Sequence, residues 1–186
     1  ASDFIKDGQT GAVRLKGSYN SNGNGTLASA ILAHRINETF EVLATGNFRQ
    51  SGLQDLAAGG TLQGSEFQAW SGLLKGTMRL DAEQVVRLSY QKWNSDADDQ
   101  DYAQTGTVPT NSPQNFGRID RTVDDQTAVL SYENPAEDNE MLDLKIQLSY
   151  SDTSVQQRNP TSPFLGSIGA ADYGYKTVQL NVANTS

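Results

Sequence analysis

The side chains that could carry out chemistry are few, and they form no catalytic constellation. His34 is the only histidine among 186 residues, and there is no cysteine. A second imidazole ligand, a thiolate metal site and a disulfide are therefore all unavailable within this chain. The sequence predicts a protein that is not an enzyme.

Acidic residues are concentrated at 95–101, where the sequence reads SDADDQD. Alternating carboxylates such as Asp96, Asp98, Asp99 and Asp101 can ligate Ca²⁺, which takes ~6–8 oxygen ligands. An EF-hand loop also needs a glycine at its sixth position and a glutamate at its twelfth, and this segment has neither. A solvated acidic loop is the better interpretation, so we predict no metal site.

Aromatic and arginine side chains in long polar segments are the remaining candidates for ligand or partner contacts. Residues of these types are enriched where proteins bind partners. Packing of the loop residues on one another is the alternative interpretation for each of them. The candidates are Tyr102, Phe116, Arg118, Phe164 and Tyr173.

The elements that must position these side chains are β-strands. Polar and apolar residues alternate strictly in LDLKIQLSY at 142–150, and a period of two is typical of a strand with two unlike faces. We predict about eight strands, each near the ~9–11 residues that a tilted membrane strand requires. They are 13–19, 26–36, 40–48, 70–80, 86–93, 128–132, 142–150 and 176–182.

Every second connection between these strands is short. The short ones are 37–39, 81–84 and 134–140; the others are the Asn/Gly turn at 20–25 and the longer segments 50–66, 94–121 and 155–174. This sorting predicts an all-β, up-and-down antiparallel meander with one simple end and one elaborated end. Outer-membrane barrels have this form, with short periplasmic turns and long extracellular loops.

Composition narrows the partners but leaves two orientations open. A net charge of −8 argues against nucleic acid as a partner, and no apolar run approaches the ~18 residues of a membrane helix.

The mean hydropathy is −0.55, yet a membrane strand puts only every second residue into lipid, so this average does not exclude a membrane barrel. The apolar face could therefore form a soluble core or contact lipid. Aromatics near strand ends, such as Trp70 and Tyr90, suit interfacial girdles, although ordinary core aromatics are the alternative.

Short sequence words carry a family resemblance. ASDF at 1–4 is followed by a G-x-V-x-L strand at 11–15, an Asn/Gly turn, an alanine-rich strand and NET at 37–39. VRLSYQ at 86–91 and the segment 132–150 fit the same pattern. Residues 1–48 thereby resemble the junction between plug and barrel in TonB-dependent outer-membrane receptors, most closely the branch that serves haem, haemoglobin and haemophores.

The resemblance implies a larger protein than this chain. Residues 1–186 would be a segment of a transmembrane β-barrel of about 22 strands, with the plug, the TonB box and the later strands absent. The receptor would lie in the bacterial outer membrane and take up haem, or iron in another carrier, driven through TonB. Its partners would be membrane lipid, the plug domain, the TonB complex and a haem-carrier protein. Haem would be transported, with no cofactor resident in this chain.

Residue roles follow from the same resemblance. Arg14, Lys16, Lys75 and Arg87 would face the lumen and the plug. His34 shares its side with apolar neighbours close to a short turn, which favours a lipid-interface position over haem ligation. Two alternatives remain open. One is a complete eight-stranded barrel with an adhesive or structural role, which requires pairing of 13–19 with 176–182; the other is a soluble β-sandwich or barrel that binds a ligand.

Overall fold

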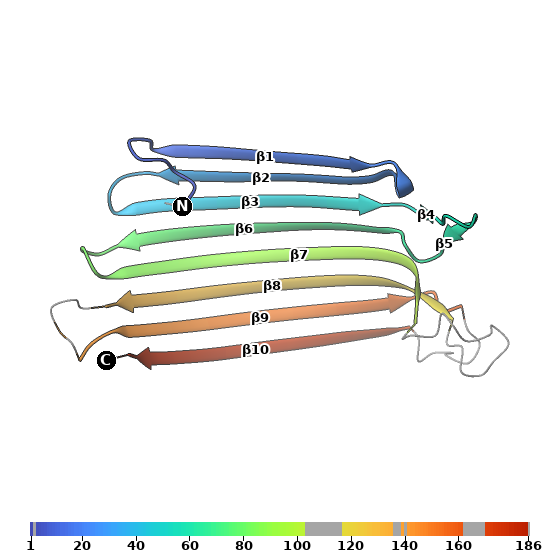
Figure 1. Ribbon diagram of the computed structural model, residues 1–186. Coiled ribbons are helices and arrows are strands. Elements are labelled where there is room, and N and C mark those ends of the chain that lie inside the picture. Colours follow the sequence, from blue (N-terminus) through green and yellow to red (C-terminus); the bar gives the residue numbers. More distant parts are fainter. Residues whose placement is uncertain (2, 103–116, 136–138, 140, 162–169, 186) are drawn as a thin grey trace.

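The computed structural model describes residues 1, 3–102, 117–135, 139, 141–161 and 170–185. Eight antiparallel strands form one sheet in the order β1-β2-β3-β6-β7-β8-β9-β10, and a small hairpin, β4–β5, stands apart (Figure 1). The elements are β1 Gly11–Asn20, the 3₁₀ turn η1 Asn22–Asn24, β2 Gly25–Arg35, β3 Phe40–Ser51, β4 Gln54–Asp55, β5 Thr61–Leu62, β6 Phe67–Arg79, β7 Val85–Asp101, β8 Arg118–Asn134, β9 Leu144–Arg158 and β10 Ala171–Asn184.

Each inner strand of the large sheet hydrogen-bonds to the strand before it and the strand after it in this order, and the edge strands β1 and β10 have one neighbour each. This order confirms the predicted up-and-down meander of about eight strands. The sheet is open: β1 and β10 lie at opposite edges (Figure 1). Among the described residues, 13–19 pair with β2 and 176–182 pair with β9, not with each other. The chain therefore does not close into the small eight-stranded barrel that was one alternative.

The connections sort into two ends, as predicted. The strand ends that the segments 36–39, 80–84 and 135–143 connect lie at one end of the sheet, which we call the short-turn end. The strand ends that 21–24, 52–66, 102–117 and 159–170 connect lie at the other end, the long-connection end (Figure 1).

Side chains close the short turns by accepting backbone hydrogen bonds. Asn37 Oδ1 accepts from the backbone N–H groups of Thr39 (3.0 Å) and Phe40 (2.8 Å). Asp81 Oδ1 accepts from those of Gln84 (2.6 Å) and Glu83 (2.9 Å). These backbone hydrogen bonds hold the pKa of Asp81 below its ordinary value of 3.8. The bond from the Gln84 N–H has the largest effect, and the bond from the Glu83 N–H comes next.

Several strands extend further than the sequence predicts, which corrects the loop assignments. Residues 94–101 belong to β7 and 118–121 to β8, so the segment 94–121 is not one long loop. In the same way β9 continues to Arg158 and β10 begins at Ala171. The outer parts of these strands are mostly polar, with isolated apolar residues such as Ile119, so the alternation that marks a strand fades while the backbone ladder continues. Residues 142 and 143, assigned to a strand, precede β9.

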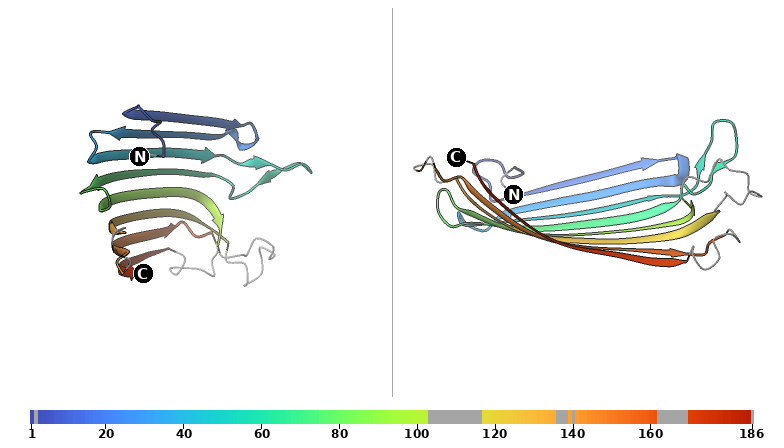
Figure 2. Two further views of the ribbon diagram at one scale, coloured as in Figure 1. Left: turned by 60° about the vertical axis from the view of Figure 1, so that its left-hand side comes forward. Right: turned by 90° about the horizontal axis from the view of Figure 1, so that it is seen from below.

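The sheet is bent and twisted, and the N-terminal segment, residues 1 and 3–10, lies on its concave side (Figure 2). Ile5 of that segment is buried with Ala33 of β2 and Leu43 of β3. No second layer packs on the opposite face within the described part of the chain, so the sandwich alternative is not observed. The helical structure of these residues includes nothing long or apolar enough to cross a membrane.

Candidate functional surfaces

The two faces of the sheet differ in chemistry because residue types alternate along the strands. Strand register then places like residues side by side: Leu74 lies between Ala44 and Tyr90 on one face. This face is opposite Ala33 and Leu43, which contact the N-terminal segment, and we call it the convex face. Its exposed apolar residues are Val13, Leu15, Leu32, Phe40, Leu74, Leu88, Leu130, Leu148, Val178, Leu180 and Val182.

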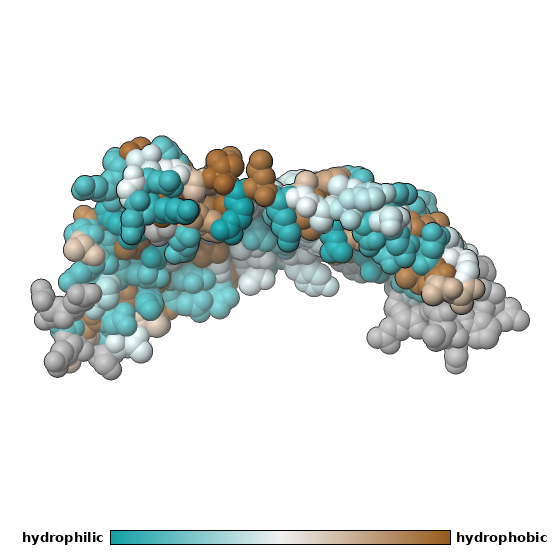
Figure 3. Space-filling model, turned by 45° about the horizontal axis from the view of Figure 1, so that its top comes forward, coloured by the Kyte–Doolittle hydropathy of each residue, from teal (hydrophilic) through white to brown (hydrophobic). Residues whose placement is uncertain are grey.

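These convex-face side chains form a continuous apolar band across all eight strands. Leu74 is 60% exposed and Leu180 is 63% exposed, so the chain itself does not cover them. Figure 3 shows hydrophobic side chains projecting midway along the β1 edge, between hydrophilic surfaces. Exposed apolar patches of this extent mark membrane or partner surfaces.

Aromatic residues border the band on the side of the long connections. Trp70, Tyr90 and Tyr150 are the last apolar residues of β6, β7 and β9 before the convex face becomes polar. Lys92 Nζ lies 5.8 Å from the centroid of the Trp70 ring. The hydroxyl of Tyr90 donates to Gln126 Oε1 at 2.9 Å, and that of Tyr150 donates to a carboxylate of its own strand at 3.2 Å.

The short-turn side of the band has a similar border. Phe40 begins β3 there, and the hydroxyl of Tyr132 donates to Gln84 Oε1 at 2.7 Å. Rings with an apolar body and a hydrogen-bonded tip are typical of membrane–water interfaces. The two borders thus enclose an apolar band of limited height.

His34 lies on the convex face, where it pairs with Gly11 and Val42 and is exposed. Its row is near the short-turn border, among apolar residues. The described residues include no group of three His, Asp or Glu side chains that could hold a metal ion. This placement is compatible with the interfacial position expected for His34.

The predicted lumen-facing residues share the concave face. Arg14 and Lys16 lie on β1, Lys75 on β6 and Arg87 on β7. The guanidinium carbon of Arg14 is 5.3 Å from the ring centroid of Phe4 in the N-terminal segment. The structure brings Arg14 to that segment, whereas Arg87 instead forms an ion pair of 2.6 Å with a glutamate of β8.

A buried carboxylate holds the concave face together near the short-turn end. Glu41 is only 3% exposed, and its Oε1 accepts from Arg35 Nε at 3.0 Å. Arg79 Nη2 lies 3.7 Å from Glu41 Oε2. Three neighbouring strands are thereby joined beneath the N-terminal segment. The partners of Glu41 come from three separate chain segments, so the sequence alone does not identify them.

The long-connection half of the concave face carries a hollow of about 330 Å³. Arg49 of β3, Phe67 of β6 and Trp93 of β7 stand around it, and the Arg49 guanidinium carbon is 5.2 Å from the Phe67 ring centroid. None of the three was singled out as a contact residue from the sequence. The one sequence signal for Phe67 and Trp93 is an aromatic residue on the face that is otherwise mostly polar in their strands, and Arg49 has no such signal.

The loop candidates separate into three groups. Arg118 forms an ion pair with Asp99, and its backbone N–H donates to Thr161 Oγ1 at 2.8 Å. Tyr173 lies beside Tyr102, and the Tyr173 hydroxyl donates to an amide oxygen of β9 at 3.3 Å. The structure brings these two tyrosines together on the concave side. Phe116 and Phe164 lie outside the described residues.

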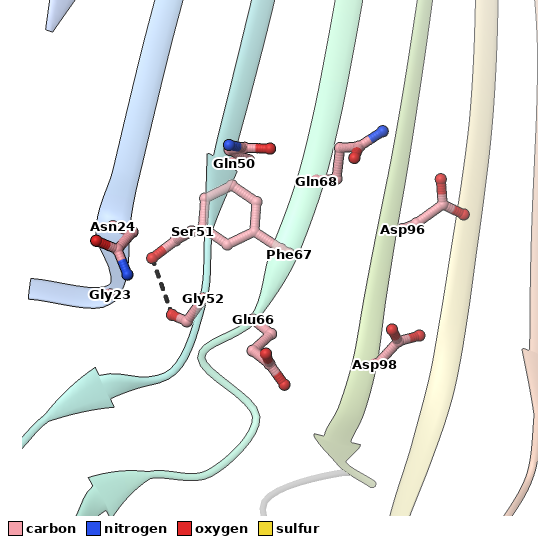
Figure 4. A pocket seen from close by; sticks show the side chains of 10 residues that line it. All are labelled: Gly23, Asn24, Gln50, Ser51, Gly52, Glu66, Phe67, Gln68, Asp96 and Asp98. Atoms are coloured by element: carbon pink, nitrogen blue, oxygen red, sulfur yellow. Dashed lines mark hydrogen bonds between the residues drawn. The ribbon is translucent and has the colours of Figure 1, made fainter. Parts of the chain in front are cut away.

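The acidic residues of 95–101 are spread along β7 and do not gather. Asp96 accepts from Thr122 Oγ1 at 2.7 Å, and Asp99 is paired with Arg118. Asp96, Asp98 and Glu66 line a pocket of about 490 Å³ at the long-connection end, where Figure 4 shows their carboxylates apart. The expected solvated acidic loop is therefore corrected to a strand.

Comparison with known proteins gives a likeness of fold. The chain matches no protein-family model and no curated protein. It is similar to a double mutant of the Serratia marcescens hemophore receptor HasR, in complex with its hemophore HasA and heme, with 21% identity over 99% of this chain and a TM-score of 0.71. It is also similar to the copper transporter OprC, with 16% sequence identity over 93% of this chain and a TM-score of 0.62. The chain spans 29% and 24% of those two chains.

Proposed function

We propose that this chain forms part of the barrel wall of a TonB-dependent receptor in the bacterial outer membrane. The observation that carries the proposal is the bordered apolar band on the convex face, opposite a face that carries Arg14, Lys16, Lys75 and Arg87. A membrane strand must put apolar side chains into lipid and can put polar ones into a wet lumen. Soluble folds reverse this arrangement.

The rest of the wall would come from further strands. Within the described ranges, the edge strands β1 and β10 each have no strand partner on one side, and backbone groups cannot remain unpaired in lipid. The chain spans less than a third of either similar structure, which supports its role as one segment of a larger barrel. Residues 1–10 would link this wall to a plug within the lumen, since they lie on the concave face.

The receptor would take up haem, or iron in another carrier, with energy transmitted from TonB through the plug. The likeness to a hemophore receptor supports haem as the cargo and a haem-carrier protein as an extracellular partner. The protein would catalyse no reaction. Tyr102 and Tyr173, at the long-connection end, would be among the residues nearest to the incoming partner.

Spin labels test the orientation of the sheet. Residues 1–186 contain no cysteine, so Leu88→Cys and Ser89→Cys each introduce one labelling site within this segment. In vesicles, the label at 88 should be more accessible to oxygen and the label at 89 to a water-soluble nickel complex, since the two point to opposite faces. Equal accessibility of both reagents at both positions would contradict a lipid-facing convex surface.

Uptake assays test the cargo and the energy source. Cells that depend on this receptor should grow on haemin as the only iron source, and growth should stop when TonB is deleted. Growth that persists without TonB would refute energised uptake. Growth on ferric siderophores but not on haemin would assign the receptor to another iron carrier.

A further inference from the structure

We propose that the hollow formed by Arg49, Phe67 and Trp93 is a cargo-contact site for a planar ring compound that carries an anionic group. The inference rests on the proposed function, because the concave face must line the path of the cargo. It goes further by naming the residues that contact the cargo and the chemistry that they select.

The shape of the hollow follows from the register of three strands. Asn47 pairs with Ser71, and Ser71 pairs with Trp93, while Ala69 pairs with Ser95 in the next row. The small side chains of 69, 71 and 95 form a low floor, and the larger ones around them form walls. A flat ring system fits such a shallow recess better than a branched molecule does.

The aromatic walls are unusual for their position. The concave face is otherwise mainly polar or charged, yet Phe67 and Trp93 both lie on it and are half-buried. Aromatic faces stack on planar rings at centroid separations of ~4.5–7 Å. Two such residues beside one floor therefore favour a ligand with its own π-system over a small hydrated ion.

Charge in the hollow is asymmetric. Arg49 is exposed, and its guanidinium, over the Phe67 ring, keeps donors available for a carboxylate. Beyond Trp93 the next residue in the row is Asp125, whose Oδ2 accepts from Thr153 Oγ1 at 2.5 Å. A carboxylate on the ligand would therefore be drawn to the Arg49 side and repelled from the Asp125 side, which orients the ring.

Binding of two porphyrins to the detergent-solubilised full-length receptor tests the site. Haemin carries two carboxylates, and mesoporphyrin dimethyl ester is a planar ring without them. We expect Arg49→Gln to weaken haemin binding about tenfold while the ester is unaffected, and Arg49→Lys to restore part of the loss. Trp93→Leu should weaken both ligands. Lys176→Gln is the control, because it also removes a positive charge but lies on the convex face of β10, away from the hollow.

The outcomes separate the site from the function. Unchanged haemin affinity in both Arg49→Gln and Trp93→Leu, with TonB-dependent growth intact, overturns the site and leaves the proposed function standing. Variant-sensitive binding without TonB-dependent growth supports the site and overturns the function. If the unaltered receptor binds neither porphyrin, the site is overturned and haem is excluded as the cargo, whereas TonB-dependent growth on another iron carrier would leave the uptake function standing. Equal weakening of the ester by Arg49→Gln contradicts the role of charge.

Discussion

Replacement of Leu74 by arginine tests directly which face of the sheet contacts lipid. Leu74 lies on the convex face of β6, between Trp70 and Leu80. From Trp70 to Leu80 the strand advances by about ten residues, which corresponds to ~34 Å at ~3.4 Å per residue. At a strand tilt of ~45° this corresponds to ~24 Å across the membrane, which is close to the ~25 Å apolar band of outer-membrane barrels.

The same geometry gives the expected cost. Leu74 would lie ~10 Å from the level of Trp70 and ~14 Å from that of Leu80, near the midplane. Arginine there costs ~2–4 kcal/mol, against ~0–1 kcal/mol near the interfaces. Because ~1.4 kcal/mol is a tenfold change, the folding equilibrium constant should fall ~30- to 700-fold.

The assay is reversible folding of the receptor into lipid vesicles, followed by tryptophan fluorescence across a guanidinium titration. Leu73→Arg is the control, since it introduces the same side chain one residue earlier on the concave face. We expect it to cost at most about 1 kcal/mol. If Leu73→Arg destabilises as much as Leu74→Arg, or more, the assignment of the convex face to lipid is wrong.

Three further predictions concern turns at both ends of the sheet and the concave face. Glu41→Gln should lower the free energy of unfolding by about 1–2 kcal/mol in chemical denaturation. This is less than the ~3–5 kcal/mol of a fully buried ion pair, because the arginine partners of Glu41 are partly exposed. The control Glu38→Gln, at an exposed position, should change almost nothing. The carboxyl group of Asp81 should titrate below 3.8 by carbon-13 NMR. Its contribution to stability is then complete above 3.8 and lost as pH falls through the lowered pKa, and a midpoint at or above 3.8 would contradict this. Gly23→Ala should cost about 1–2 kcal/mol in thermal unfolding, because φ is +73° and the new Cβ would lie 2.8 Å from a backbone carbonyl; Gly46→Ala, with nothing within 4 Å, should cost less.

Local periodicity predicted the sheet because each strand needs only its own alternation to define two faces. Leu144, Ile146 and Leu148 show this, since their spacing alone assigns them to one face and the register confirms it. The same signal fails beyond the apolar band. Asp98 and Asp101 were assigned to a loop because both faces are polar there, although backbone pairing continues to Asp101.

Contacts between distant positions were not predictable from this one sequence. Arg49 and Trp93 are brought to one hollow by the register of β3, β6 and β7, and a shift of one residue would turn either to the other face. Ile5 packs on β2 and β3 although nothing in its own neighbourhood indicates burial. The hydrogen bonds that Asp81 accepts come, by contrast, from residues only two and three positions later in the chain. Even these bonds depend on the backbone geometry of the turn, which the sequence does not specify in detail.

The strict neighbour-to-neighbour order of the sheet makes the wall a one-dimensional array. Because every strand hydrogen-bonds only to its chain neighbours, the stability of the wall is approximately a sum of adjacent-strand contributions. A hairpin inserted between two others would leave the remaining interfaces unchanged. Walls of different circumference are therefore accessible from the same repeating unit, and duplication of hairpins is a simple evolutionary route between them.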